Sequence, residues 1–140
     1  MTKMTAKDWE ILAEFGVTPD NLVVHRDLDL RCSKIKALPE GLVVHGHLDL
    51  INTEIEEIPK SITVGKKLFL HRTKIPAIHT DERDYKLYRI ETNSCTFYVA
   101  GCRIFRSASE AIEHWSSDDY PNSVRGQGFV DAILKAENGA

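Results

Sequence analysis

The 140-residue sequence lacks both a strong charge imbalance and any long apolar run. Eighteen Lys and Arg residues against 21 Asp and Glu residues give a net charge of −3, so no overall field attracts nucleic acid or an anionic membrane. No run approaches the roughly 18 apolar residues of a membrane helix, and residues 1–9 contain no apolar signal region. We therefore expect an intracellular, cytoplasmic protein with no membrane partner.

Cysteine is scarce, and the pattern of the three cysteines excludes common uses of this residue. These cysteines are Cys32, Cys95 and Cys102. Their odd number and the lack of a C-x-x-C pair argue against a disulfide framework or a zinc site, and fit a reducing compartment. His25, His45 and His47 are further candidate ligands, but no acidic or thiol partner accompanies them at a fixed spacing. We predict no metal and no cofactor.

Common catalytic motifs are also missing. The Walker, dinucleotide-binding, G-x-S-x-G and H-E-x-x-H patterns are absent. A thiol and imidazole pair formed by Cys102 and His114 is our third-ranked functional hypothesis, a small enzyme, although no pattern indicates an activated thiolate. We predict no catalytic residue and no enzyme activity.

What the sequence does contain is an internal repeat of 20 residues between Asn21 and Thr80. The triplet Leu28-Asp29-Leu30 recurs as Leu48-Asp49-Leu50 and as Leu68-Phe69-Leu70. Such a short fixed period is typical of solenoids, in which each repeat buries its apolar face against the next. Since side chains alternate along a strand, the leucines are expected to point inward and their neighbours outward. A hydroxyl follows each triplet and is expected to bond the backbone at a bend: Ser33, Thr53 and Thr73.

The pattern L-x-L-x-x-[ST]-x-I-x-x-[LI]-P resembles the short bacterial type of leucine-rich repeat. It covers about 60 of the 140 residues, with Ala77-Ile78-His79 replacing the proline ending in the third copy. The resemblance implies a leucine-rich-repeat-like β-solenoid that binds a partner through its outward strand face.

The N-terminal flank predicts a helix from about Ala6 to Phe15. Thr5 and Asp8 have the spacing of a capping box, and Gly16 is suited to end the helix. Its apolar face is expected to cover the first repeat.

The C-terminal flank predicts a β-hairpin and two helices. Alternation indicates strands at Tyr85–Ile90 and about Cys95–Ile104, with a turn at Thr92–Ser94. Ser107 and Glu110 predict the start of a helix that continues through Trp115. A final helix is expected from about Asn122 to Ala136, after Pro121 and with a buried stripe of four apolar residues. These are Phe129, Val130, Ile133 and Leu134.

These elements predict an α+β fold in one domain, residues 1–140. A helical cap occupies residues 1–20, three leucine-rich-repeat-like repeats of 20 residues occupy 21–80, and a hairpin with two helices forms a C-terminal cap at 81–140.

The tail resembles the ends of uncharacterised phage and prophage proteins that couple similar repeats to such a tail. The resemblance is carried by Ala100-Gly101-Cys102-Arg103, Glu110-Ala111, His114-Trp115, Arg125-Gly126 and Phe129-Val130-Asp131-Ala132-Ile133. It implies a phage-related setting, in which a host or defence protein is the expected partner and the host cytoplasm the expected location.

The leading functional prediction is a non-catalytic protein-protein interaction module. Its partner would bind the outward rows of the repeats, with Ile51 and Phe69 as apolar anchors and the charged residues selecting the partner. These rows contain Asp27, Asp29, Arg31, His47, Asp49, Ile51, Lys67, Phe69 and His71. Asp29 and Asp49 would lie opposite each other, where like charges are unfavourable. We expect either that Arg31, His47 or Lys67 supplies a compensating cation, or that the two carboxylates bind a basic partner.

The alternative is nucleic-acid binding through the basic and aromatic C-terminal region. Aromatic rings could there stack on bases while basic side chains contact phosphates. The residues in question are Tyr85, Lys86, Tyr88, Arg89, Phe97, Tyr98, Arg103 and Arg106.

Overall fold

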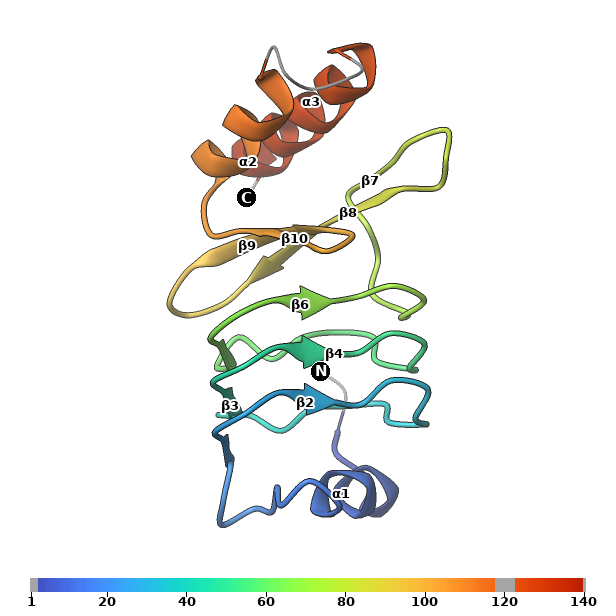
Figure 1. Cartoon of the computed structure of the whole chain (residues 1–140), viewed down its shortest axis with the longest axis vertical. Coiled ribbons are helices and arrows are strands. Elements are labelled where there is room, and N and C mark those ends of the chain that lie inside the picture. The colour runs from blue at the N-terminus through green and yellow to red at the C-terminus, as the bar shows by residue number, and fades with distance from the viewer. Residues whose placement is uncertain (1–2, 118–122, 140) are drawn as a thin grey trace. The chain divides into compact units, whose positions relative to one another are not determined.

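The computed structural model describes residues 3–117 and 123–139 of the chain (Figure 1). Its contacts divide the chain into two compact units. Unit 1 comprises Met1–Ile75 with Thr92–Ser94, and unit 2 comprises Pro76–Glu91 with Cys95–Ala140. The predicted single domain over residues 1–140 stays a prediction.

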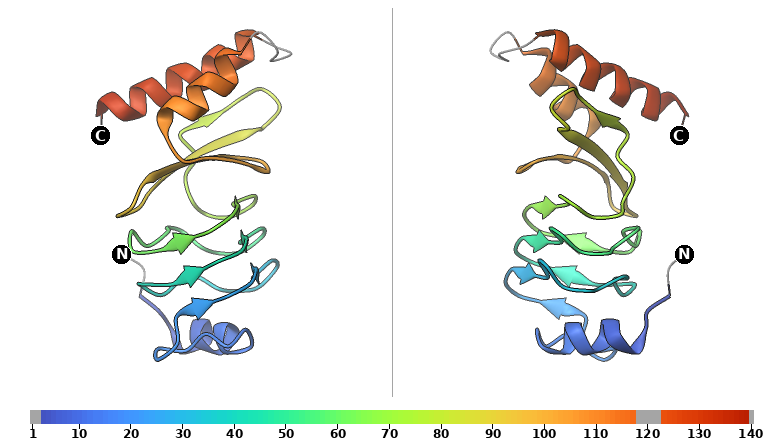
Figure 2. Two further views of the ribbon diagram at one scale, coloured as in Figure 1. Left: turned by 60° about the vertical axis from the view of Figure 1, so that its left-hand side comes forward. Right: turned by 90° about the vertical axis from the view of Figure 1, so that its right-hand side faces the viewer.

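Unit 1 contains one helix and two parallel three-stranded sheets. Its helix is α1 (Ala6–Ala13). One sheet has the order β1-β3-β5, with β1 (Val23–Val24), β3 (Val43–Val44) and β5 (Thr63–Val64). The other has the order β2-β4-β6, with β2 (Leu28–Asp29), β4 (Leu48–Asp49) and β6 (Leu68–Phe69). Figure 2 shows successive chain segments of unit 1 following similar courses, one beside the next.

Both parallel sheets have the register of the 20-residue repeat. Leu28 pairs with Leu48 and Leu48 with Leu68, while Val23 pairs with Val43 and Val43 with Thr63. The three leucines are buried, and so are those two positions later. The predicted alternation, with leucines inside and their neighbours outside, is therefore confirmed.

A left-handed residue follows each strand of the β2-β4-β6 sheet, which the repeat pattern did not predict. Cys32 and Asn52 have φ of 58° and Arg72 has φ of 55°. Two of the predicted bend hydroxyls donate to the backbone, from Thr53 Oγ1 to Leu50 O at 2.8 Å and from Thr73 Oγ1 to Leu70 O at 3.0 Å. The prediction is wrong for Ser33, whose buried Oγ has no hydrogen-bond partner among the described residues.

The helix α1 starts with the predicted capping box. Thr5 Oγ1 accepts from the N–H of Asp8 at 3.2 Å, and Asp8 Oδ2 accepts from the N–H of Thr5 at 3.0 Å. Asp8 also accepts from the N–H of Lys36 at 2.9 Å, which fixes the start of α1 to the first repeat. Gly16, with φ of 81°, occupies the predicted left-handed position after the helix.

Unit 2 contains a four-stranded antiparallel sheet and two helices. The strand order is β10-β9-β8-β7, formed by β7 (His79–Thr80), β8 (Lys86–Glu91), β9 (Thr96–Ala100) and β10 (Arg103–Phe105). The predicted two-stranded hairpin is wrong because the expected long second strand reverses at Gly101, which has φ of 58°. The hydroxyl of Tyr85 donates to Ala100 O at 2.9 Å beside this turn.

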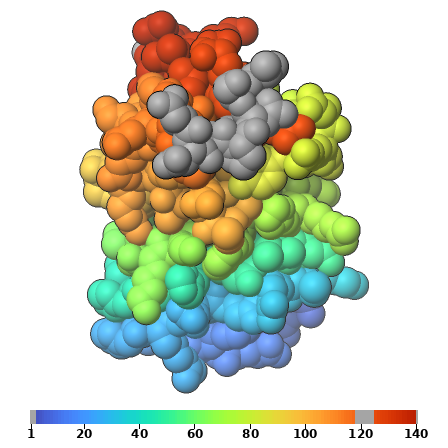
Figure 3. Space-filling view, turned by 45° about the horizontal axis from the view of Figure 1, so that its top comes forward, coloured from blue at the N-terminus to red at the C-terminus, as the bar shows by residue number. Residues whose placement is uncertain are grey.

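The helices α2 (Ala108–Ser116) and α3 (Ser123–Gly139) pack on each other and share a core with the sheet. Figure 3 shows the outer surface of this part of the chain in orange and red. Trp115 and Phe129 stack at the centre of the core, with ring centroids 4.7 Å apart. Of the four residues of the predicted buried stripe, Phe129, Val130 and Ile133 are buried, whereas the prediction is wrong for Leu134, which is 46% exposed. The predicted helix start at Pro121 and Asn122 lies outside the described residues.

The predicted fold class, an α+β fold with a short leucine-rich-repeat-like β-solenoid, an N-terminal helical cap and a C-terminal β-hairpin plus two helices, is wrong. The described residues form a mixed α/β fold with three helices and three sheets, two parallel and one antiparallel. The strands of the parallel sheets are only two residues long, and unit 2 adds a four-stranded sheet and core of its own. No helix in residues 3–117 and 123–139 combines the length and apolar character needed to cross a membrane.

Candidate functional site

The outer face of the β2-β4-β6 sheet brings together all nine residues predicted to bind a partner. The pairing of Asp29 with Asp49 and of Asp49 with Phe69 sets three rows across the strands. The rows are Asp27, His47, Lys67; Asp29, Asp49, Phe69; and Arg31, Ile51, His71. We call this surface the outer face. That it binds a partner stays a prediction.

The first row links the strands through side-chain acceptors. Asp27 Oδ1 accepts from the N–H of His47 at 2.7 Å, and His47 Nδ1 accepts from the N–H of Lys67 at 3.0 Å. The imidazole of His47 also lies 5.9 Å from the ring of Phe69. Asp27 and His47 thus have a structural role, because each satisfies a backbone donor of the next repeat.

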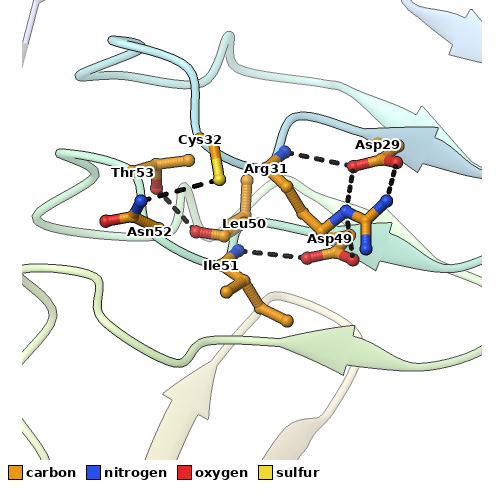
Figure 4. A network of polar contacts seen from close by, with 8 residues as sticks. All are labelled: Asp29, Arg31, Cys32, Asp49, Leu50, Ile51, Asn52 and Thr53. Carbon is orange, nitrogen blue, oxygen red and sulfur yellow. Dashed lines mark hydrogen bonds and ion pairs between the residues drawn. The ribbon is translucent and has the colours of Figure 1, made fainter.

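The second row contains the predicted pair of opposed carboxylates, and Arg31 compensates them (Figure 4). Its Nε and Nη2 donate to Asp29 Oδ1 and Oδ2, each at 3.0 Å, in a bidentate arrangement. The same Nε lies 3.5 Å from Asp49 Oδ2. The hydrogen bond and charge of Asp29 raise the pKa of Arg31. The repulsion expected between Asp29 and Asp49 is therefore relieved within the chain.

Asp49 lies at the centre of the outer face, and its side chain is only 19% exposed. Burial raises the pKa of its carboxyl group and the charge of Asp29 adds to this rise, whereas the N–H of Ile51 and the charges of Arg31 and His71 act in the opposite direction. The net rise shows that its hydrogen bonds and cations do not fully replace the water that its carboxylate loses. Ile51 and Phe69, the predicted apolar anchors, are half-buried beside it.

A cavity of about 470 Å³ adjoins the edge of the outer face at β2. Ile11 and Phe15 of the α1 region line it together with Asp29, Arg31 and Cys32. Cys32 is an exposed free thiol, and Asn52 Nδ2 lies 3.6 Å from its sulfur atom. This contact was missed from the sequence, although the 20-residue spacing between the two residues could have indicated it.

Several of the basic and aromatic residues of unit 2 are buried or bind other residues of the same unit. The rings of Tyr88, Phe97 and Tyr98 are buried. Arg89 donates to the hydroxyl of Tyr98 at 3.2 Å and forms ion pairs with Glu91 and Glu137. Burial is the first cause that raises the pKa of Tyr98 to about 12, followed by its hydrogen bond to Glu137. The buried rings are therefore not available to stack on bases.

Cys102 and His114, the residues of the enzyme hypothesis, lie in different surroundings. Cys102 is an exposed free thiol in the turn between β9 and β10. The imidazole of His114 packs on Phe105 and Trp115, with centroid distances of 5.2 Å and 5.1 Å. Burial, and then the charge of Arg103, lower the pKa of His114. These ring contacts indicate a packing role for His114.

Of the three histidines considered as metal ligands, His47 lies on the outer face, whereas His25 and His45 follow the strands β1 and β3 of the other parallel sheet. The rings of His25 and His45 stack with centroids 5.2 Å apart and planes inclined by 12°. In the part of the chain that the structure describes, no three His, Cys, Asp or Glu residues converge in a way that could hold a metal ion.

No family model, curated protein or solved structure matches the chain. The resemblances to leucine-rich repeats and to phage proteins therefore stay predictions from the sequence.

Proposed function

We propose that the chain is a non-catalytic binding module whose outer face recognises a protein partner. The observation that supports this proposal is the composition of the face. Charged side chains and two half-buried apolar side chains, Ile51 and Phe69, lie in adjacent rows of one short sheet. Apolar anchors surrounded by charges are typical of protein interfaces.

The role of the paired carboxylates differs from that of the apolar anchors. Because Arg31 binds Asp29 bidentately, the ion pair of Arg31 and Asp29 gives the outer face a fixed arrangement of charges at β2. Lys67 adds a cation at β6. Such a pattern favours one orientation of a bound protein and disfavours others.

The proposal includes a cytoplasmic location and, by analogy with phage-related proteins, a host or defence protein as partner. Supporting features are the three free thiols, Cys32, Cys95 and Cys102, since extracellular proteins commonly pair their cysteines. The analogy rests on the sequence resemblance alone.

The test is quantitative affinity capture from a lysate of the source cell with three forms of the protein. These are the wild type, Phe69→Ala, and the matched control Leu134→Ala, which truncates an exposed apolar residue of unit 2. We expect a protein that the wild type and the control capture and that Phe69→Ala loses. Capture of the same proteins by all three forms, with unchanged melting temperatures, would contradict the proposal.

A further inference from the structure

The outer face contains two equivalent gaps between neighbouring strands, and a guanidinium group of the chain itself occupies the first. At the second gap the charge of His71, on the β6 side, acts on Asp49. In the gap between β2 and β4, the guanidinium group of Arg31 lies between Asp29 and Asp49. In the gap between β4 and β6, the residue equivalent to Arg31 is Ile51. The position equivalent to Asp49 on the next strand is Phe69. The second gap therefore offers a carboxylate, an aromatic ring and an aliphatic side chain, but no guanidinium group.

Asp49 retains hydrogen-bonding capacity toward a further cation. Its Oδ1 accepts from the N–H of Ile51 at 3.1 Å, whereas Arg31 Nε is 3.5 Å from its Oδ2. That second distance exceeds the usual 2.7–3.2 Å of an N–H···O hydrogen bond. A carboxylate has about four acceptor positions. The bidentate bond of Arg31 to Asp29 thus leaves Asp49 as the less completely paired of the two carboxylates.

We infer that the gap formed by Asp49, Ile51 and Phe69 binds an arginine side chain of the protein partner. The inference rests on the proposed function and names the chemistry that the partner presents. The guanidinium group would bind the Asp49 carboxylate, its plane would stack on the Phe69 ring, and its methylene groups would contact Ile51. Arginine suits this gap better than lysine because its planar group both binds carboxylates in two places and stacks on rings.

The charges of the outer face fit such an occupant. The outer face contains three carboxylates, Asp27, Asp29 and Asp49, but only two permanently charged cations, Arg31 and Lys67. A further cation would therefore balance its charge. The chain also uses the same chemistry internally, since the guanidinium carbon of Arg106 lies 4.9 Å from the centroid of the Phe97 ring.

The test is a titration of the isotope-labelled full chain, followed by NMR, with N-acetyl-arginine amide as the probe. N-acetyl-citrulline amide is the matched neutral probe, because it has nearly the same shape without the charge. We expect arginine amide to shift the backbone amides of Ile51 and Phe69 with a dissociation constant in the millimolar range. Citrulline amide should bind about tenfold more weakly. Equal shifts with both probes, or arginine shifts confined to other parts of the chain, would overturn the inference.

Variants locate the bound probe. Asp49→Asn keeps an acceptor for the N–H of Ile51 but removes the charge, and we expect it to reduce arginine binding to the level of citrulline. Phe69→Leu keeps an apolar side chain without the ring, and a roughly two- to fivefold loss is expected. Asp20→Asn, at an exposed aspartate of unit 1, is the control and should change nothing. Undiminished arginine binding by Asp49→Asn would also overturn the inference.

The outcome for the inference is separate from that for the proposed function. Protein capture that depends on Phe69, without arginine binding at Asp49, refutes the inference alone. Arginine binding at Asp49, without any protein whose capture depends on Phe69, supports the gap as a guanidinium site and refutes the proposed function.

Discussion

Replacement of Asp8 by alanine is expected to destabilise unit 1 strongly, because this carboxylate joins α1 to the first repeat. Asp8 is 1% exposed and accepts hydrogen bonds from Thr5 N, Thr5 Oγ1 and Lys36 N. Loss of the capping interaction costs about 1 kcal/mol. The unsatisfied N–H of Lys36 adds about 1–3 kcal/mol. The expected loss in free energy of unfolding is therefore about 2–4 kcal/mol.

The assay is urea unfolding followed by tryptophan fluorescence. Trp9 lies in α1 and Trp115 in unit 2, so a Trp115→Phe background makes the emission report on unit 1 alone. Asp8→Asn keeps one acceptor oxygen, so its free energy of unfolding should fall by less than that of Asp8→Ala, about 1–2 kcal/mol. Asp20→Ala, at an exposed position, is the control and is expected to change stability by less than about 0.5 kcal/mol. Equal effects of Asp8→Ala and Asp20→Ala would refute the reasoning.

Three further predictions concern the repeats of unit 1. Gly46→Ala should lower the free energy of unfolding by about 1–3 kcal/mol, because the added Cβ would lie 2.7 Å from Asp27 N and 2.1 Å from Asp27 Oδ1. The control Gly139→Ala should leave the free energy of unfolding unchanged, because a Cβ at that position meets no atom within 4 Å. Arg72→Asn should raise the free energy of unfolding by about 0.5–1 kcal/mol, since asparagine tolerates the left-handed backbone that this position has, with φ of 55°. A free energy of unfolding below that of the wild type, measured by urea unfolding, would contradict this explanation. Asp49→Asn should raise the melting temperature more at about pH 7 than at about pH 3, because a raised folded-state pKa means that stability is lost as the carboxyl group ionises. An equal rise at both pH values would contradict the last prediction.

The strand register of unit 1 could be predicted from the sequence because the period of 20 residues aligns the same side chains on neighbouring strands. Leu28, Leu48 and Leu68 are buried in the predicted register, and the nine outward residues share one face as expected. The capping box of Thr5 and Asp8 was equally predictable, because it depends on residues three positions apart.

Other features depend on contacts that no local pattern contains. The hydrogen bond from Lys36 N to Asp8 joins residues 28 positions apart. The turn at Gly101 interrupts a segment of strand-forming residues, and β7 is too short to recognise from alternation. The predicted fold class was wrong because the 20-residue repeat does not indicate the four-stranded sheet and the separate core of unit 2. Leu134 follows the helical apolar spacing, but its side chain is 46% exposed while Ile133 beside it is fully buried.

The bidentate geometry of Arg31 could not be predicted either. The sequence indicated only that Asp29 and Asp49 needed a cation, with Arg31, His47 and Lys67 as candidates. The structure assigns that role to Arg31, while His47 accepts from the N–H of Lys67. This division leaves the second gap of the outer face without a guanidinium group.

The most direct test of a partner on the outer face is photo-crosslinking in the source cell. A benzoylphenylalanine introduced at position 69 would be compared with the same residue at position 134, an exposed apolar position of unit 2. We predict one protein adduct from position 69 that is lost when Asp49→Asn is added, and no such adduct from position 134. An adduct from position 134 with none from position 69 would contradict the proposed binding face.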